Sequence, residues 1–243
     1  MEAIGLIAEQ VKVCETAGVE ILCCPEAVLG GLADYSDDPA DLGIDVGSGH
    51  LRTRLSPLAS DSVTTIVGFT EAGTDGRWFN SAAVFSQNEV VGVYRKMHLA
   101  INRSVYTAGA AAELFKVGSL VFGIAICRDS TFAELVQGMV ARGATAVFVP
   151  TNNALAPAKG GAEVVAHARQ TDAQRATEGG IWVVRADVAG RINGLESYGS
   201  SAITGCDGAV RQVARQLQPD LLIADIGVRN RSDIQMEPTR AES

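Results

Sequence analysis

Short apolar runs alternate with amphipathic stretches along this chain, and that alternation limits the folds it can adopt. The longest run covers residues 120–127, far short of the roughly 20 apolar residues that a membrane-spanning helix needs. Runs of this length are typical of strands that are buried on both faces. Buried strands are expected at residues 19–26, 120–127 and 144–151, and further strands at 181–190 and 221–226. Helices are expected at residues 2–18, 50–60, 130–143 and 161–180.

Other segments predict hairpins instead of crossovers. Their strands are expected at residues 63–72, 79–86 and 90–99, and at 197–204 and 209–214. Turn-like segments separate the first three strands, which predicts an antiparallel meander. A Cys206-Asp207-Gly208 turn is expected to join the last two. Loops are expected at residues 30–49 and 101–114. Strands that alternate with helices in one part of the chain and form hairpins in another predict an α/β layered fold with a mixed sheet.

The composition excludes several classes of partner. Lys and Arg number 20 against 28 Asp and Glu, so the formal net charge is −8. A chain this acidic lacks the basic face with which proteins bind nucleic acid or an anionic membrane surface. No repeat and no Pro- or Ser-rich linker divides the 243 residues. We therefore expect a single domain over 1–243, with a core at about 2–226 and a polar tail at 227–243.

The cysteines and histidines predict neither a metal centre nor a cofactor. Five Cys and three His are spread along the chain without the spacing of a metal site. An odd number of Cys in a chain of this size is typical of free thiols in a reducing compartment. The acidic, amphipathic first residues do not resemble a signal peptide, so we expect a cytoplasmic protein.

Three apolar strands end on side chains that together suit covalent catalysis, namely Glu26, Lys96 and Cys127. Sites in α/β sheets gather beyond the carboxyl ends of strands, so these side chains could converge. They would supply a base, a cation for an oxyanion and a nucleophile. Taken singly, each also suits a structural role, as a loop carboxylate, a surface charge and a core thiol.

The neighbours of Cys127 favour a thiolate. A helix that starts between Ser130 and Phe132 would bring its N-terminal amides near the thiol and, with a nearby cation, lower the pKa. His98 is the closest histidine in sequence, and its two-residue offset from Lys96 predicts that both lie on one face of a strand.

The segments around these residues resemble the nitrilase superfamily of carbon–nitrogen hydrolases. The resemblance rests on CPEAVLGG, YRKMHL and GIAICRDSTFAEL, in that order, with VYTAG, AVFVPTNN, ARQTDAQRATEGGIWVVRADVAG and SYGSSAITGCDGAV in support. It covers about residues 2–226. The family implies a four-layer α-β-β-α sandwich with mixed sheets and a homo-oligomer, a dimer or larger.

The resemblance also implies a reaction. Cys127 would attack the carbon of a small non-peptide amide or nitrile and form a thioester or, from a nitrile, a thioimidate. Glu26 would transfer the protons, while Lys96 and the backbone N–H of Arg128 would stabilise the oxyanion. An amidase is the leading interpretation, with nitrile-specific and N-carbamoyl-specific hydrolases as alternatives. A catalytically silent binding or assembly subunit is the alternative from another class.

Two residues depart from the family pattern. Asn102 stands where many members carry a second Glu after the Lys, and this departure motivates the silent alternative. Arg128 stands where Tyr, Trp or Asn is more familiar, and it suits either an acidic substrate or an ion pair with Asp129 or Glu134. Glu134 itself suits either a supporting role at the site or a helix-dipole role. Candidate pocket residues are Tyr106, Asn152 and Asn153.

The resemblance finally implies that the N-terminal first strand is missing. Family members usually begin with a strand before the first helix, whereas this chain begins within that helix at Met1. A missing internal strand leaves ladder groups of its neighbours unpaired.

We expect a version of the chain extended at its N-terminus by about twenty residues to be more stable, because the added strand would satisfy those ladder groups. Thermal unfolding of the two versions measures the difference, and equal melting temperatures would count against this expectation.

Overall fold

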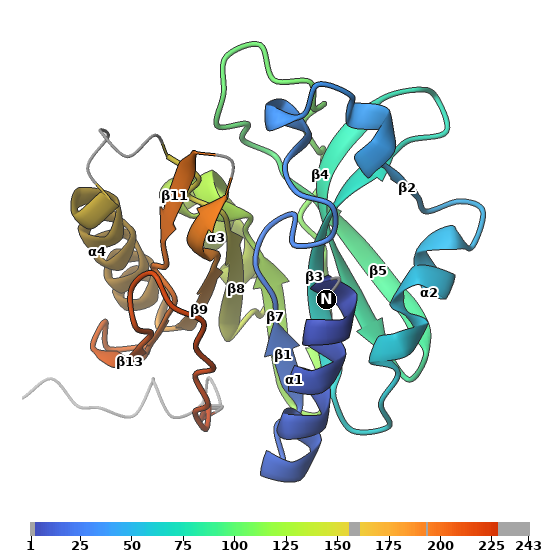
Figure 1. Ribbon diagram of the computed structural model, residues 1–243. Helices are drawn as coiled ribbons and strands as arrows, with labels where there is room; N and C mark the ends of the chain where they lie inside the picture. Colours follow the sequence, from blue (N-terminus) through green and yellow to red (C-terminus); the bar gives the residue numbers. More distant parts are fainter. Residues whose placement is uncertain (1–2, 156–160, 193, 228–243) are drawn as a thin grey trace, which may run out of the picture.

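Two β-sheets lie face to face, with helices on their outer sides (Figure 1). The computed structural model describes residues 3–155, 161–192 and 194–227. The first sheet contains β1 (Ile21–Cys23), β2 (Ile44–Asp45), β3 (Thr64–Ala72), β4 (Trp78–Ser86) and β5 (Glu89–Arg95). The second contains β6 (Leu114–Val117), β7 (Leu120–Ile124), β8 (Ala146–Thr151), β9 (Trp182–Asp187), β12 (Ala202–Thr204) and β13 (Val210–Val213). A separate hairpin pairs β10 (Ala189–Ile192) with β11 (Leu195–Tyr198).

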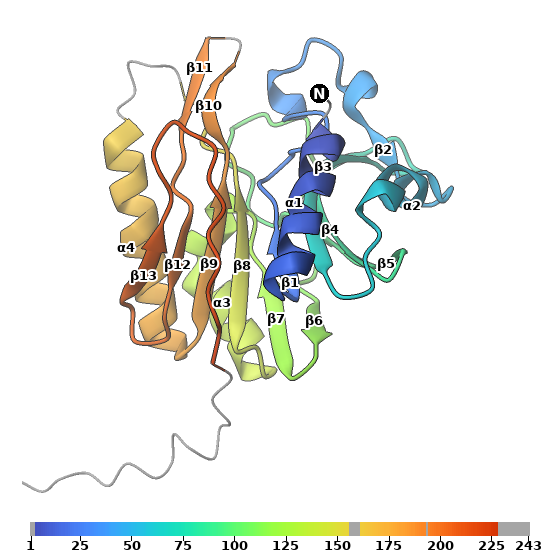
Figure 2. The same cartoon turned by 60° about the horizontal axis from the view of Figure 1, so that its bottom comes forward.

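Four helices cover these sheets. They are α1 (Ala3–Ala17), α2 (His50–Leu55), α3 (Ala133–Ala141) and α4 (Gly161–Gly179). Short 3₁₀ turns are η1 (Ala33–Tyr35), η2 (Pro39–Leu42), η3 (Ser56–Leu58) and η4 (Cys127–Thr131). Apolar residues of α1 and α2 pack on the first sheet, and those of α3 and α4 pack on the second. Figure 2 shows the strands of the second sheet side by side from β13 to β6, with α4 along the outside.

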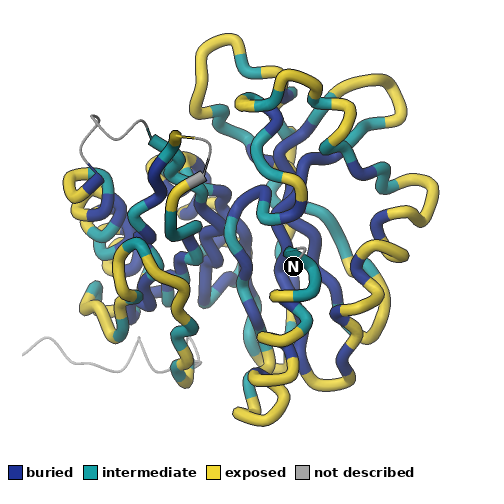
Figure 3. The backbone as a smooth tube through the Cα atoms, in the orientation of Figure 1, coloured by how far each residue is buried: buried dark blue, intermediate teal, exposed yellow. Residues whose placement is uncertain are grey.

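The alternation of side chains along each strand sorts the apolar residues into three cores. On β8, Phe148 points to the first sheet whereas Val149 points to the core under α3 and α4. On β3, Ile66 points to the second sheet whereas Val67 points to the core under α1 and α2. Buried residues therefore follow the strands, and exposed ones follow the loops and outer helix faces (Figure 3). The expected four-layer α-β-β-α sandwich is confirmed.

The strand directions bring several carboxyl ends to one side of the molecule. In the first sheet β1 runs parallel to β3, and the β3-β4-β5 meander is antiparallel as predicted. Strands β1 and β5 therefore end on the same side. In the second sheet β7, β8 and β9 are parallel. A backbone hydrogen bond of 3.3 Å from the N–H of Glu26 to the carbonyl of Thr151 joins the ends of β1 and β8.

The expected strand at 197–204 is interrupted and forms parts of two sheets. Residue Tyr198 ends β11, and β12 begins at Ala202. Between them, Ser200 donates hydrogen bonds from its backbone N–H and its hydroxyl to Oδ2 of Asp187, each 2.7 Å long. These bonds turn the chain toward β9, so one continuous strand cannot form. The expected strand at 181–190 is likewise divided, between β9 and β10.

The prediction of a strand at residues 221–226 is wrong. This segment pairs with no strand of the described residues. The side-chain amide of Gln212 replaces a partner strand: its Nε2 donates to the carbonyl of Ile223 at 2.6 Å, and its Oε1 accepts from the N–H of Ile223 at 3.2 Å. The segment is also only partly buried, with Ile223 40% exposed, so its apolar residues do not form a buried strand. The polar tail expected at 227–243 lies outside the described residues except for Gly227.

A large cavity borders the edge of β1 that faces away from β3. Within the described residues no strand pairs with that edge. The cavity has a volume of about 520 Å³ and is lined by residues on β1, the β6–β7 turn, β9 and the segment 220–226. In the part of the chain that the structure describes, no helix is long and apolar enough to cross a membrane.

Phe122 tests the core between the sheets. Its side chain is fully buried, and its ring centroid lies 5.6 Å from that of Phe115 and 5.1 Å from that of Phe148. We expect Phe122→Ala to lower the free energy of unfolding by about 3–5 kcal/mol, because it leaves a cavity between two sheets. Urea titration measures the change. The control Val91→Ala removes two methyl groups from a residue that is 60% exposed. It should lower the free energy of unfolding by less than about 0.5 kcal/mol. Equal costs for the two variants would contradict this packing.

Candidate active site

Four chain segments end beside one another and enclose a small cavity. Its wall includes Glu26 after β1, Lys96 after β5, Cys127 after β7 and Asn152 after β8. The cavity volume is about 50 Å³. The structure thus brings together the three side chains that the strand ends predicted to converge.

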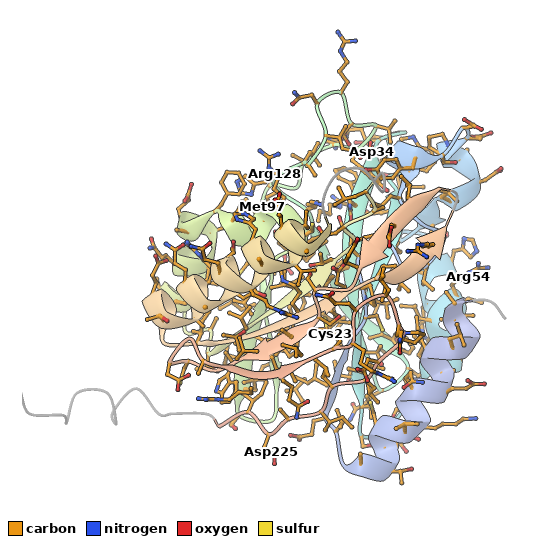
Figure 4. All side chains as sticks on the ribbon, turned by 60° about the vertical axis from the view of Figure 1, so that its left-hand side comes forward. Cys23, Asp34, Arg54, Met97, Arg128 and Asp225 are labelled. Atoms are coloured by element: carbon orange, nitrogen blue, oxygen red, sulfur yellow. The ribbon has the colours of Figure 1, made fainter. Side chains whose placement is uncertain are left out.

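Two loops complete the cavity wall, one from 32–35 and one from 99–106. They are joined by Asp34, which accepts hydrogen bonds from the hydroxyl of Ser104 and the N–H of Val105, both at 2.8 Å. In Figure 4, Asp34 lies at the upper end of the molecule with Met97 and Arg128, opposite Asp225 beside the larger cavity. Among the described residues no group of three or more His, Cys, Asp or Glu side chains is placed to hold a metal ion.

Glu26 is a buried carboxylate with hydrogen bonds to both oxygens. Its Oε1 accepts from Nζ of Lys96 at 2.6 Å and from Nδ2 of Asn80 at 2.7 Å. Its Oε2 accepts from the backbone N–H of Asn152 at 2.8 Å. A buried charge is tolerated when it is paired and hydrogen-bonded in this way. The three donors fix the carboxylate in the wall of the cavity.

Lys96 supplies a buried positive charge. Burial lowers the pKa of its ammonium, but the negative charge of Glu26 and the hydrogen bond to it outweigh burial and raise the pKa above its ordinary value. The ammonium therefore stays protonated. Strand β5 ends at Arg95, so the expectation that Lys96 and His98 share one face of a strand is wrong. Lys96 turns toward Glu26, whereas His98 contacts Asp129.

Cys127 begins the 3₁₀ turn η4 and has a positive φ of +49°. This left-handed conformation is uncommon for a residue with a side chain. The first bond within the turn runs from the N–H of Asp129 to the carbonyl of Ile126, at 3.0 Å. The N–H groups of Cys127 and Arg128 precede that bond and have no partner inside the turn. The backbone N–H of Arg128 can therefore meet an oxygen beside the thiol.

The pKa of the Cys127 thiol is raised to about 12, so the expected lowering is wrong. Burial raises this pKa most, and the negative charge of Glu26 raises it further, whereas Lys96 and Arg185 lower it. The helix α3 begins only at Ala133, because η4 takes up the residues after the cysteine. The thiol is therefore protonated at neutral pH, and forming a thiolate requires a base.

Asp129 ties the turn that bears the cysteine to the loop that bears the lysine. Its carboxylate is fully buried. Oδ1 accepts from the backbone N–H of His98 at 2.7 Å and lies 2.9 Å from its Nδ1. Oδ2 accepts from the hydroxyl of Tyr94 at 2.7 Å. It also accepts from the N–H groups of Ile126 and Met97, at 3.2 and 3.4 Å. Nothing in the sequence around Asp129 indicated this role.

Four of the predicted site residues lie outside the cavity wall, namely Asn102, Arg128, Glu134 and Asn153. The guanidinium of Arg128 is exposed and donates to the carbonyl of Ala100 at 3.4 Å, so it pairs with neither Asp129 nor Glu134. Asn102 and Glu134 are exposed, and neither lines the cavity. The prediction for the backbone N–H of Arg128 stays a prediction.

Tyr106 and Asn152 line the cavity as predicted, but through groups with structural partners. The hydroxyl of Tyr106 lies 2.7 Å from Oγ1 of Thr70 and accepts from the N–H of Ala33 at 2.7 Å. This leaves the ring of Tyr106, and not its hydroxyl, for a bound molecule. Asn152 contacts Glu26 through its backbone N–H, and its Oδ1 lies 3.5 Å from the hydroxyl of Ser197.

Asn153 stands directly beside the thiol. Its Oδ1 lies 3.8 Å from Sγ of Cys127. Its Nδ2 donates to Oδ2 of Asp187 at 3.0 Å, and its backbone N–H lies 3.3 Å from Oδ1 of the same carboxylate. Asp187 thereby orients the Asn153 amide. The role of Asp187 was not predicted, although its place in the RAD sequence of the family resemblance offered a signal.

A buried ion pair braces the second sheet below the cavity. Arg185 binds Asp172 through two nitrogens, with Nε–Oδ2 at 2.7 Å and Nη2–Oδ1 at 2.5 Å. The same guanidinium donates to Oγ1 of Thr151 at 2.8 Å and to Oγ of Ser130 at 3.0 Å. It therefore connects α4 and β9 to the end of β8 and to η4, and it carries positive charge toward Cys127.

Two glycines permit the close backbone approaches at this end of the sheets. A Cβ on Gly68 of β3 would lie 2.4 Å from the carbonyl oxygen of Pro25 and 2.8 Å from Cα of Glu26. A Cβ on Gly109 would lie 2.3 Å from the carbonyl oxygen of Arg95, next to Lys96. Any side chain at either position would displace a segment that carries a cavity residue.

Comparison with known proteins decides the family. The family model described as carbon-nitrogen hydrolase matches residues 1–234. The chain belongs to the nitrilase superfamily of carbon–nitrogen hydrolases. It is 25% identical to a nitrilase of Pyrococcus abyssi, over 91% of this chain and 83% of that protein. It is 26% identical to a glutamine-dependent NAD(+) synthetase of Xylella fastidiosa, over 92% of this chain but 41% of that protein. The NitN amidase of Nesterenkonia sp. AN1 shares the fold, with a TM-score of 0.75, 23% identity and coverage of 95% of this chain and 91% of that one.

This membership confirms the family that the motifs resembled. The relatives bear the names of three different activities, so the family by itself does not fix the substrate. The roles of the individual residues of this carbon–nitrogen hydrolase stay predictions that rest on the geometry above.

Asp129→Asn tests the brace between the two loops. The amide would keep one acceptor oxygen and place an NH₂ among N–H and O–H donors, so we expect the free energy of unfolding to fall by about 2–4 kcal/mol. Chemical denaturation measures the change. Asp61→Asn is the matched control, because Asp61 is exposed, and it should change stability by less than about 0.5 kcal/mol. A loss as small as that of the control would contradict the role of Asp129.

Proposed function

We propose that this chain is a cysteine-dependent hydrolase that cleaves the carbon–nitrogen bond of a small, non-peptide amide. One observation carries the proposal: Glu26, Lys96 and Cys127 line a single cavity, and the lysine ammonium lies 2.6 Å from the glutamate carboxylate. A base, a fixed cation and a nucleophile are the groups that acyl transfer through a thioester requires.

The first half of the reaction forms the thioester. Glu26 takes the proton of the Cys127 thiol while Sγ attacks the carbonyl carbon of the amide. This proton transfer is necessary because the raised pKa keeps the thiol protonated. The carbonyl oxygen becomes an oxyanion, which the ammonium of Lys96 and the backbone N–H of Arg128 stabilise. One positioned donor of this kind contributes about 2.7–4 kcal/mol to catalysis.

The second half releases both products. Glu26 gives the proton to the departing nitrogen, and the carbon–nitrogen bond breaks. Ammonia departs, and the acyl group stays bound to Sγ as the thioester. Glu26 then takes a proton from a water molecule, which attacks the thioester carbonyl through a second oxyanion. The carboxylic acid departs, and the proton returns to the thiol. The sum is hydrolysis of an amide to a carboxylic acid and ammonia, with each proton carried by Glu26.

The size of the cavity favours a small substrate group. A volume of about 50 Å³ is far below the roughly 300–1,000 Å³ of a pocket for a drug-sized ligand. A terminal carboxamide suits it better than a peptide. Two of the similar proteins, a glutamine-dependent synthetase and an amidase, are named for amide substrates and one is named a nitrilase, so nitriles are the alternative substrates to be tested.

Loss of the nucleophile tests this function. We expect Cys127→Ala to reduce ammonia release from short primary amides by at least about a thousandfold, because no thioester can form. The panel includes the matching nitriles and N-carbamoyl amino acids. Cys206→Ala is the matched control, because Cys206 lies in the turn between β12 and β13, and it should keep wild-type activity.

Lys96→Met tests the lysine ammonium, which would stabilise the oxyanion and also pairs with Glu26. We expect the turnover number to fall by about 10²–10³-fold, the effect of losing one oxyanion donor. Lys116→Met, on the exposed surface of β6, controls for loss of a positive charge. Ammonia release that survives in Cys127→Ala would overturn the mechanism. Wild-type protein that releases no ammonia from any of the three substrate classes would favour the silent subunit.

A further inference from the structure

One buried polar atom in the cavity wall has no partner. Asn80 lies on β4, is 3% exposed and lines the cavity with Glu26, Lys96 and Cys127. Its Nδ2 donates to Oε1 of Glu26 at 2.7 Å. Its Oδ1 has no hydrogen-bond partner among the described residues. Buried polar groups are nearly always hydrogen-bonded, so this oxygen calls for an explanation.

The contact with Glu26 fixes which end of the amide is the oxygen. If the side chain were turned over, Oδ1 of Asn80 would face the carboxylate oxygen of Glu26, and two acceptors at 2.7 Å would repel each other. The NH₂ group is therefore held toward Glu26, and the acceptor is directed away from it.

The partner that Oδ1 lacks must be a donor. Lys96, the cation in the wall, directs its ammonium to Glu26 at 2.6 Å and makes no hydrogen bond to Oδ1. The hydroxyl of Tyr106, also in the wall, is held by Thr70 and Ala33. A donor that enters the cavity beside Glu26 would satisfy Oδ1 and relieve the cost of a buried, unpaired acceptor.

We infer that Oδ1 of Asn80 accepts a hydrogen bond from the leaving NH₂ group of the substrate, so that the site selects primary amides. The inference rests on the proposed function, in which Glu26 protonates the leaving nitrogen and that nitrogen therefore lies beside Glu26. Asn80 binds the same carboxylate, so its amide borders the same position. A nitrile has no N–H there, and an ester has an oxygen that Oδ1 would repel.

Asn80 also positions Glu26, and the experiment must separate the two roles. A primary amide and the methyl ester of the same acid share the acyl group, the attack by Cys127 and the need for Glu26. They differ at the leaving atom, which carries N–H donors only in the amide. A weakened Glu26 lowers the amide rate more than the ester rate, because Glu26 protonates the leaving nitrogen, and it also shifts the pH dependence of both rates. Loss of the Oδ1 contact alone lowers the amide rate and leaves the pH dependence unchanged, so both rates are measured across a range of pH.

The test measures kcat/KM for both substrates in the wild-type chain and in Asn80→Ala. We expect the ratio of amide to ester to fall by about tenfold or more in Asn80→Ala, the effect of one lost hydrogen bond. Gln137→Ala removes an exposed amide on α3 and should leave the ratio unchanged. If Asn80→Ala does not fold, the same ratio is read from Asn80→Ser.

Each outcome decides the inference. A fall in the ratio with the pH dependence of both rates unchanged supports it, whereas a fall with a shifted pH dependence overturns it. An unchanged ratio, with both rates reduced alike, overturns it and leaves Asn80 only as a support for Glu26, while the proposed function stands. Wild-type protein that cleaves neither substrate overturns the proposed function, and this inference falls with it.

Discussion

A buried carboxylate that receives three hydrogen bonds organises this end of the molecule. Glu26 draws its donors from β4, from the end of β5 and from the end of β8, so it connects the two sheets through one side chain. Removing one member of a buried ion pair leaves the other charged and unpaired, at a cost of about 3–5 kcal/mol. The contacts that hold the sheets in register beside Cys127 are therefore the contacts that the proposed chemistry uses, and stability and reactivity are coupled here.

Two buried carboxylates near the thiol differ in what they can do. Asp129 is surrounded by three backbone N–H groups, a tyrosine hydroxyl and an imidazole, so its oxygens have no room for a further proton donor. Glu26 faces the cavity, and two of its three donors are side chains. The first carboxylate is a fixed anchor, and the second suits the proton transfers that we propose for it. The hydrogen-bond partners of the two carboxylates, and not their burial, distinguish the structural role of Asp129 from the role proposed for Glu26.

The sequence predicted those features that depend on local patterns. Apolar runs that end on polar residues located Glu26, Lys96 and Cys127, because parallel strands deliver their carboxyl ends to one side. It could not predict features that depend on partners distant in the chain. The pairing of Ile223 with the Gln212 amide, the anchoring by Asp129 and the open acceptor of Asn80 arise from three-dimensional neighbours. The prediction of a lowered pKa for the Cys127 thiol was wrong for the same reason, because burial and the nearby carboxylate of Glu26 raise this pKa.

Gly68 has a consequence for how such sites are found. The backbone around Glu26 presses against β3 so closely that only a hydrogen atom fits between them. The position of Glu26, the proposed proton carrier, thus depends on Gly68, a residue without a side chain. When remote chains are searched for the proposed chemistry, the three proposed catalytic residues alone are an incomplete signature. A glycine at the middle of the strand equivalent to β3 belongs to this signature as well.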